Sequence, residues 1–188
     1  MYQILEQEEI EKVLLAGMSM GGYPSQMFAY KYPERTLGFV AIDTTPFGHG
    51  YYSKSDLWWL KKVAPMSKWF GASMLRKSMA KSVSVTDYSY QKMMEMLAPL
   101  SKAEIIEQMD IAYGKFVEEN QDITLKCPVL ILLGDQDKTG RVGQYCREWA
   151  KQTGYPLHIV KNAAHFSNGD NAKQVNCEIE TYLKKWIE

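Results

Sequence analysis

The chain has 188 residues, of which 46% are hydrophobic and 12% aromatic, so it can bury one substantial core. Its 22 basic and 22 acidic residues balance, which excludes a global attraction to nucleic acid or to anionic membranes. The sequence has neither an export signal nor an apolar stretch of the roughly 18 residues that a membrane span needs. We therefore expect one cytoplasmic domain over residues 1–188, with no nucleic-acid partner and no stable membrane anchor.

The cysteines are three in number and widely spaced. This pattern fits neither a disulfide framework nor a metal-binding knuckle. We expect free thiols in a reducing compartment.

The first part of the chain alternates between strand and helix patterns. Residues 3–11 are acidic and helix-prone, and they lead into an apolar run over 12–16 that is typical of a buried parallel strand. A glycine-rich turn over 17–22 follows, and the pattern then predicts a helix over 22–32. A second buried strand is predicted over 37–42.

The last part of the chain continues the alternation. A third apolar strand is predicted over 127–133, and apolar residues at helical spacing start at Val142 and end at Gly154. A fourth short strand over 157–160 precedes a last helix with one apolar face over 175–186. Strands that alternate with helices predict an α/β fold, with a parallel sheet of about four strands flanked by helices.

Between the second and third strands, residues 46–122 carry only helical signals. One helix is predicted over 55–64, ended by Pro65, and a capping box of Ser101 and Glu104 opens another. An all-helical insertion between two strands of a parallel sheet predicts a cap.

The turn after the first strand holds the most informative motif, Gly17-x-Ser19-x-Gly21. A serine on a tight strand-to-helix turn is held in a strained backbone conformation, and the glycines let neighbouring segments approach. Its hydroxyl stands near the positive end of the following helix, and the Met20 N–H faces the place where an oxyanion would form. The motif predicts that Ser19 is a nucleophile.

Two other interpretations of this turn remain open. A dinucleotide-binding turn also joins a strand to a helix and needs an acid about twenty residues later, which Asp43 would supply. Against it, Ser19 replaces the glycine over which a pyrophosphate must lie. The third interpretation is a serine in an ordinary tight turn.

A serine nucleophile needs a base, and the chain has three histidines. His165 follows the fourth strand directly, in a loop at the carboxyl end where parallel sheets gather their sites. His158 lies inside that strand and fits a structural role better. His49 lies at the entrance of the cap and could touch substrate.

The third member of a triad is a carboxylate that orients the imidazole. Asp135 and Asp137 both follow the third strand. Asp137 lies further into the loop and can reach toward His165, whereas Asp135 can cap the turn locally. Asp43, at the end of the second strand, remains a possible substitute acid.

The predicted cap is basic and aromatic. Between residues 46 and 86 it has one acidic and seven basic residues, interleaved with aromatic and methionine side chains. The simpler interpretation is a set of amphipathic helices with solvated lysines. The alternative is an adaptable apolar acyl pocket with a basic rim. For that pocket the candidate substrate-binding residues are Met18, His49, Trp58 and Trp59.

Several segments together resemble the α/β-hydrolase superfamily, in its lid-bearing serine hydrolase form: residues 17–22, 32–34, 42–44, 128–137 and 164–166. By that resemblance Ser19, Asp137 and His165 occupy the triad positions, in the expected chain order. The resemblance implies hydrolysis of a carboxylic ester or related acyl bond of a small, hydrophobic substrate, with no metal or organic cofactor.

The sequence departs from the family's pattern at its N-terminus. Only eleven residues precede Lys12, and the usual N-terminal strands are lacking. The strand over 12–16 would then be an exposed edge, which predicts a homodimer or an N-terminal partner paired there. The second oxyanion donor would also be missing. An impaired hydrolase that acts as a binding module is therefore the alternative function.

Overall fold

The computed structural model describes residues 1–187. Its sheet has four parallel strands in the order β1-β2-β3-β4, which confirms the predicted fold class. Their bounds are β1 Val13–Met18, β2 Thr36–Ile42, β3 Val129–Gly134 and β4 Leu157–Val160. All neighbouring pairs are parallel, so every strand presents its carboxyl end at the same edge of the sheet.

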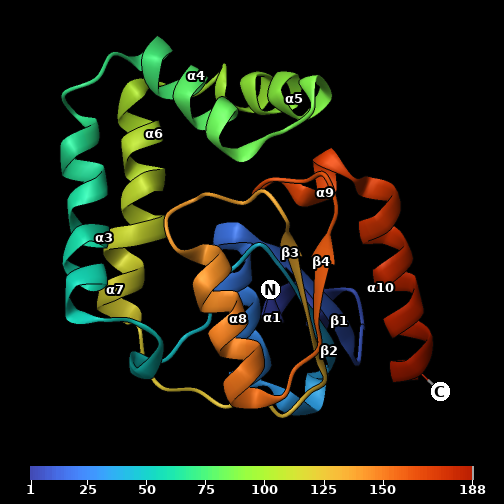
Figure 1. Cartoon of the computed structure of the whole chain (residues 1–188). Helices are drawn as coiled ribbons and strands as arrows, with labels where there is room; N and C mark the ends of the chain where they lie inside the picture. The colour runs from blue at the N-terminus through green and yellow to red at the C-terminus, as the bar shows by residue number, and fades with distance from the viewer. Residues whose placement is uncertain (188) are drawn as a thin grey trace.

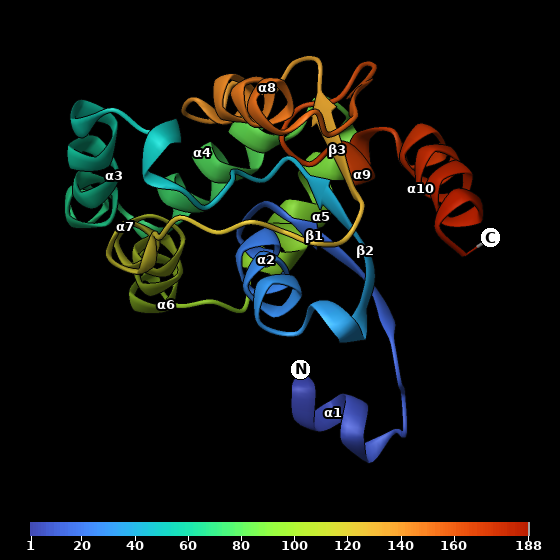
Figure 2. The ribbon, with the colours of Figure 1, turned by 90° about the horizontal axis from the view of Figure 1, so that it is seen from below.

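Helices cover both faces of this sheet (Figures 1 and 2). Helix α2 (Gly22–Lys31) and helix α8 (Val142–Thr153) lie on one face, and α10 (Ala172–Ile187) lies on the other. Helix α8 ends at Gly154, whose φ of +76° is the left-handed C-cap conformation that the sequence predicts. The structure is therefore a three-layer α/β fold around one sheet.

Alternate residues of the strands fill two cores. In β2, Phe39 and Ala41 face α2 and α8, whereas Val40 and Ile42 face the α10 side. All six residues of β3 are buried. A strand that is buried on both faces must be apolar throughout, which is why continuous apolar runs predicted these strands correctly.

Truncation of Phe39 tests the larger core. Its side chain is fully buried in the cluster between β2, α2 and α8. Phe39→Ala should lower the free energy of unfolding by about 3–5 kcal/mol, through lost burial and the cavity left behind. Urea denaturation of the variant and the wild type measures the difference. A loss below about 1 kcal/mol would contradict this packing, because such a small cost is typical of surface positions.

The segment between β2 and β3 is helical throughout its regular structure (Figure 1). Helices α3, α6 and α7 stand beside the sheet, and α4 and α5 lie across its upper end in this view. Their bounds are α3 Lys54–Ser67, α4 Ala72–Val83, α5 Asp87–Leu97, α6 Lys102–Met109 and α7 Phe116–Glu119, with a π-helical turn over Asp110–Lys115. The capping box of Ser101 and Glu104 is present at the start of α6.

One predicted helix end is wrong. Helix α3 continues through Pro65 to Ser67 rather than ending before the proline. A proline costs a helix one backbone hydrogen bond and strains the preceding turn, but Pro65 lies only two residues before the end of α3. The Ser67 hydroxyl donates to the Val63 carbonyl at 2.8 Å and thereby supports the last turn.

Two further short helices are α1 (Tyr2–Gln7) and α9 (Ser167–Asp170), and short 3₁₀ turns cover Pro33–Arg35 and His49–Tyr51. Figure 2 shows α1 projecting from the body of the molecule. An ion pair of 2.7 Å between Arg35 and Glu6 ties it to the segment before β2. No helix within residues 1–187 is long and apolar enough to cross a membrane.

Candidate active site

Ser19 lies on a strained turn at the carboxyl end of β1. Its φ is +48°, a left-handed conformation that a serine adopts only when its surroundings impose it. A 3₁₀ turn over Ser19–Gly21 then joins β1 to α2. The strand, turn and helix expected around Ser19 are therefore present.

The glycines that this turn requires differ from the expected pair. A Cβ at Gly17 would lie 2.5 Å from the Gly21 carbonyl oxygen, and one at Gly22 would overlap the Thr44 side chain. A Cβ at Gly21 would meet nothing within 4 Å. The close approach of neighbouring segments thus depends on Gly17 and Gly22, not on Gly17 and Gly21 as the motif suggested.

The structure brings together three side chains that are remote in sequence. The Nε2 atom of His165 lies 2.7 Å from the Ser19 Oγ, and its Nδ1 atom lies 2.8 Å from the Asp137 Oδ2. The side chain of His165 is 7% exposed and that of Asp137 is fully buried. His165 therefore bridges the hydroxyl and the carboxylate in a water-poor setting.

One tautomer of His165 satisfies both contacts. A carboxylate only accepts, so Nδ1–H donates to Asp137 and Nε2 is left to accept from the Ser19 hydroxyl. In this arrangement the imidazole can take the hydroxyl proton, and the buried carboxylate stabilises the imidazolium that results. The chemistry available is general-base activation of a serine.

The two rival acids have other partners. Asp135 Oδ1 accepts from the Ala163 N–H at 3.2 Å. Asp43 accepts from the Gly134 N–H at 2.8 Å and from the Ser167 N–H at 3.2 Å. Neither makes a hydrogen bond to His165, so the geometry favours Asp137 as the orienting acid. Burial of Asp43 also leaves it unable to hold a ribose, as a dinucleotide-binding turn would require.

Asp43 links the loops that carry the acid and the base. Gly134 precedes the acid loop and Ser167 follows His165 by two residues, so the carboxylate holds both loops through their amides. Its φ is +45° and its side chain is fully buried. Burial raises the pKa of Asp43 to about 6, although hydrogen bonding with Ser167 and the Gly134 N–H and the nearby His165 act in the opposite direction.

The raised pKa of Asp43 predicts a pH dependence of stability. Because the folded-state pKa lies above the ordinary value of 3.8, Asp43 contributes stability below pH 3.8 that is lost as the pH rises through about 6. The difference in unfolding free energy between the wild type and Asp43→Asn should therefore grow by up to about 3 kcal/mol from pH 7 to pH 4. Urea denaturation at both pH values measures it. An unchanged difference would show that Asp43 has an ordinary pKa.

Two connected cavities adjoin Ser19. The smaller, of about 40 Å³, has Ser19, Met20 and His165 in its wall. The larger, of about 190 Å³, lies next to it toward α3 and the π-helical turn. Both cavities are lined by Tyr23, Thr45, Ala112, Tyr113, Thr139 and Val142. The serine hydroxyl thus opens on a partly open space large enough for a small molecule.

Comparison with known proteins identifies the family. The model of the alpha/beta hydrolase fold matches residues 1–172. The chain belongs to the α/β-hydrolase family. No curated protein matches the sequence significantly.

Solved structures of other α/β-hydrolase-type proteins share the fold at low sequence identity. An esterase from Thermogutta terrifontis superposes with a TM-score of 0.69 at 21% identity, covering 97% of this chain and 69% of that protein. A bromoperoxidase from Bacillus anthracis gives a TM-score of 0.71 at 19% identity, covering 97% of this chain and 71% of that protein. A carboxylesterase of Nitrososphaera gargenis gives a TM-score of 0.67 at 16% identity, covering 99% of this chain and 70% of that protein.

The structure places the four expected substrate-binding residues apart from these cavities. Met18 packs with the apolar cluster on the α10 side of the sheet. His49 is exposed and lies 3.4 Å from Asp122. Trp58 and Trp59 are 54% and 57% exposed on α3. None of the four lines the small or the large cavity of this α/β-hydrolase.

The residues that do line the cavities were not among the substrate-binding residues expected from the sequence. Tyr23 lies on α2 four residues after Ser19, and Tyr113 lies on the π-helical turn. A π-helical turn is rare and is often found at functional sites, but no sequence pattern announces it. The position of Tyr23 one helical turn after the nucleophile is the one signal that could have identified it.

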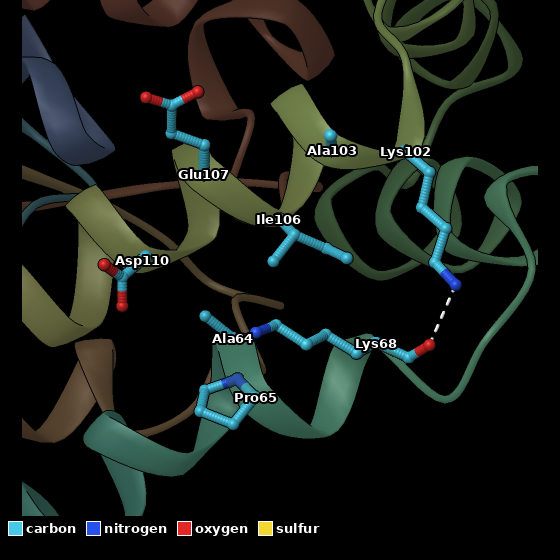
Figure 3. A pocket seen from close by; sticks show the side chains of 8 residues that line it. All are labelled: Ala64, Pro65, Lys68, Lys102, Ala103, Ile106, Glu107 and Asp110. Carbon is cyan, nitrogen blue, oxygen red and sulfur yellow. Dashed lines mark hydrogen bonds between the residues drawn. The ribbon is translucent and has the colours of Figure 1, made fainter.

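A third hollow of this α/β-hydrolase lies away from Ser19. It measures about 700 Å³ and opens between α3 and α6 (Figure 3). Ile106 forms part of its apolar wall, and Lys102 donates to the Lys68 carbonyl at 2.8 Å across one end. No member of the Ser19 cluster lines it. Among residues 1–187, no group of three or more histidine, cysteine or acidic side chains could hold a metal ion.

Proposed function

We propose that the chain is a serine hydrolase that cleaves a carboxylic ester or related acyl bond with the triad Ser19, His165 and Asp137. The hydrogen-bonded sequence from Ser19 Oγ through His165 to Asp137, with distances of 2.7 and 2.8 Å, carries this proposal. Such an arrangement activates an alcohol that is otherwise a weak nucleophile. No metal or organic cofactor takes part in the proposed reaction.

The proposed reaction has two halves. Ser19 Oγ attacks the carbonyl carbon while His165 Nε2 takes its proton, and the proton passes to the leaving alcohol as the C–O bond breaks. Water then attacks the acyl-serine with His165 again acting as base, which releases the acid and restores Ser19. The Met20 N–H, at the start of the turn into α2, would stabilise the oxyanion with the helix dipole.

Residues 46–122 act in this proposal as a cap over the site. The Val83 carbonyl accepts from the Phe166 N–H at 2.7 Å, directly beside His165. The side chain of Asp170, in the same loop region, accepts from the Thr86 N–H at 2.9 Å. The helical segment is thus hydrogen-bonded to the loop that bears the base, and a small, hydrophobic substrate would bind beneath it.

A serine-directed fluorophosphonate tests the proposed function. The wild type should react at Ser19 and hydrolyse p-nitrophenyl esters, and Ser19→Ala should do neither. The alternative proposal is a catalytically impaired hydrolase that acts as a binding module. Unlabelled Ser19 in folded protein would overturn the hydrolase and leave the binding module.

The free edge of β1 supports a further proposal about partners. Within residues 1–187 no strand pairs with the outer edge of β1, where Val13 and Leu14 are only half-buried. We propose that this edge pairs with a second polypeptide, in a homodimer or with a separate N-terminal partner, because an open apolar edge favours strand addition. The occupant would seal the sheet beside Ser19.

A charge on this edge should block the pairing. Ala16 is exposed on β1, so Ala16→Lys should convert a dimer into a monomer at high concentration without unfolding the protein. Analytical ultracentrifugation measures the mass, and Tyr30→Lys, an exposed position on α2, is the matched control. A monodisperse wild-type monomer would exclude the homodimer.

We also propose a cytoplasmic location. The cysteines support it, because Cys127, Cys146 and Cys177 are all unpaired. Fractionation of the source cells tests it, and recovery of the protein outside the cytoplasm would contradict it.

A further inference from the structure

The larger cavity beside Ser19 has aromatic walls that are already fixed in place. Phe116 stacks on Tyr23 with ring centroids 4.4 Å apart and contacts Tyr52 at 5.4 Å. Tyr52 in turn lies 4.5 Å from Tyr145. All four rings line the cavity of about 190 Å³. Aromatic rings in mutual contact form a rigid wall that suits a flat or compact apolar group.

The polar ends of two of these tyrosines are already engaged. The Tyr52 hydroxyl donates to the Pro46 carbonyl at 2.6 Å, and the Tyr23 hydroxyl lies 3.2 Å from the Thr45 Oγ1. Burial raises the pKa of Tyr23 to about 12, so this wall stays neutral. The tyrosines therefore offer ring surface rather than free hydroxyl groups to a ligand.

The one charged residue in the wall is also paired. Arg141 Nη1 lies 2.9 Å from the Asp56 Oδ1, which joins the loop before α8 to α3. A substrate carboxylate would have to compete with Asp56 for this guanidinium. The cavity consequently favours an uncharged group over an anionic one.

An unpaired hydroxyl lies at the junction between the larger cavity and the site of Ser19. Among the described residues, the buried Thr139 Oγ1 has no hydrogen-bond partner, and Thr139 lines both the small and the large cavity. A buried hydroxyl without a partner is costly, and a ligand oxygen placed there would satisfy it. The polar end of a ligand would therefore lie near Ser19 and its apolar end among the aromatic rings.

The volume limits the size of that apolar end. An apolar cavity of about 150 Å³ accommodates benzene, so about 190 Å³ accommodates a group of roughly six to eight carbon atoms. The acyl half of an ester stays attached to the serine through both steps, whereas the leaving group must depart after the first. A cavity of limited volume beside the nucleophile is thus suited to the acyl half.

We propose that the cavity bounded by α3, the π-helical turn and α8 is an acyl pocket for uncharged, compact acyl groups of about six to eight carbons, aromatic ones included. This inference rests on the proposed function, because it assigns a substrate class to the same serine. Val63 on α3 lines the acyl pocket but not the small cavity, so it sets the acyl length without touching the reacting atoms.

A series of p-nitrophenyl esters with one leaving group tests the acyl pocket. The wild type should prefer hexanoate and phenylacetate over acetate and dodecanoate by at least about tenfold in kcat/KM, since each buried methylene contributes up to about fourfold. Val63→Phe should remove this preference by lowering kcat/KM for hexanoate to about the value for acetate. Val63→Ala should shift the optimum to a longer chain.

The matched control lies in the hollow between α3 and α6. Ile106→Phe adds a ring of the same kind there and should leave the acyl preference unchanged (Figure 3). A change with Ile106→Phe but not with Val63→Phe would overturn the inference by placing the acyl group in the other hollow. In a series of acetates that differ only in the alcohol, kcat/KM should vary little. A clear optimum in the length of the alcohol would place that half of the ester in the cavity and would also overturn the inference.

A small probe separates failure of the acyl pocket from failure of the proposed function. A fluorophosphonate with only ethyl substituents needs no pocket beyond Ser19. Labelling at Ser19 together with a flat acyl profile would overturn the acyl pocket alone. Absence of labelling in folded protein would overturn both.

Discussion

Replacing Ser19 by alanine should lower kcat/KM for p-nitrophenyl hexanoate by about 10⁴–10⁶, to the level of the background reaction. The reason is that His165 then has no hydroxyl from which to take a proton, although its 2.8 Å contact with Asp137 remains. Initial rates at low substrate concentration measure the effect. The side chain is small and only half-buried, so the fold should persist.

The matched control for this variant is Ser78→Ala, an exposed serine on α4. Its activity should stay within about twofold of the wild type, because surface substitutions of this kind cost little. Circular dichroism and thermal unfolding verify the fold of both variants. Retention of wild-type turnover in Ser19→Ala would show that the hydrolysis comes from another residue or from a contaminant.

Asp137→Asn should lower kcat by about 10⁴ while KM changes little. The asparagine amide would donate to Nδ1, so the imidazole would carry its proton on Nε2 and could no longer accept from the Ser19 hydroxyl. The buried imidazolium would also lose its counter-charge. Steady-state kinetics with the same ester measures both constants.

Asp135→Asn is the matched control, two residues earlier in the same loop. Asp135 is exposed and accepts from the Ala163 N–H, with no hydrogen bond to His165. Its variant should retain kcat within about tenfold, the typical range for loss of a single peripheral hydrogen bond. A larger loss of kcat in Asp135→Asn than in Asp137→Asn would contradict this account, because it would make Asp135 the acid that orients His165.

The sheet was predictable because its strands are buried on both faces. Phe39 and Val40 face opposite cores, so the pattern between 37 and 42 is continuously apolar rather than alternating. Residues 129–134 show the same feature. Because the strands are parallel, the turn after β1, the loop after β3 and the loop after β4 all lie at one edge of the sheet. Ser19, Asp137 and His165 are therefore within reach of one another.

The pocket was not predictable from local pattern. Trp58 and Trp59 are adjacent on one helix, where successive side chains point about 100° apart, so no single cavity beneath α3 could take both. The rings that do form the wall come from four places: helix α2, the segment that precedes α3, helix α7 and helix α8. They meet only through tertiary packing. Aromatic composition predicted the kind of surface but not its residues.

The turn after β1 shows another feature that the sequence motif did not predict correctly. Gly21 and Gly22 are adjacent, and the sequence motif selects Gly21 by its spacing from Ser19. The packing instead requires Gly22, because Thr44 at the end of β2 leaves no room for a side chain there. That requirement depends on the neighbouring strand, which a motif of local spacing does not include.

The rate of phosphonylation at Ser19 tests most directly whether His165 activates this hydroxyl. After reaction with a fluorophosphonate, peptide mass spectrometry locates the adduct within the tryptic peptide 13–31. The wild type should carry the adduct on Ser19, and His165→Ala should react at least about 10³-fold more slowly, the scale of loss seen when a catalytic base is removed. Equal rates in the two proteins, or an adduct on another residue, would contradict the triad.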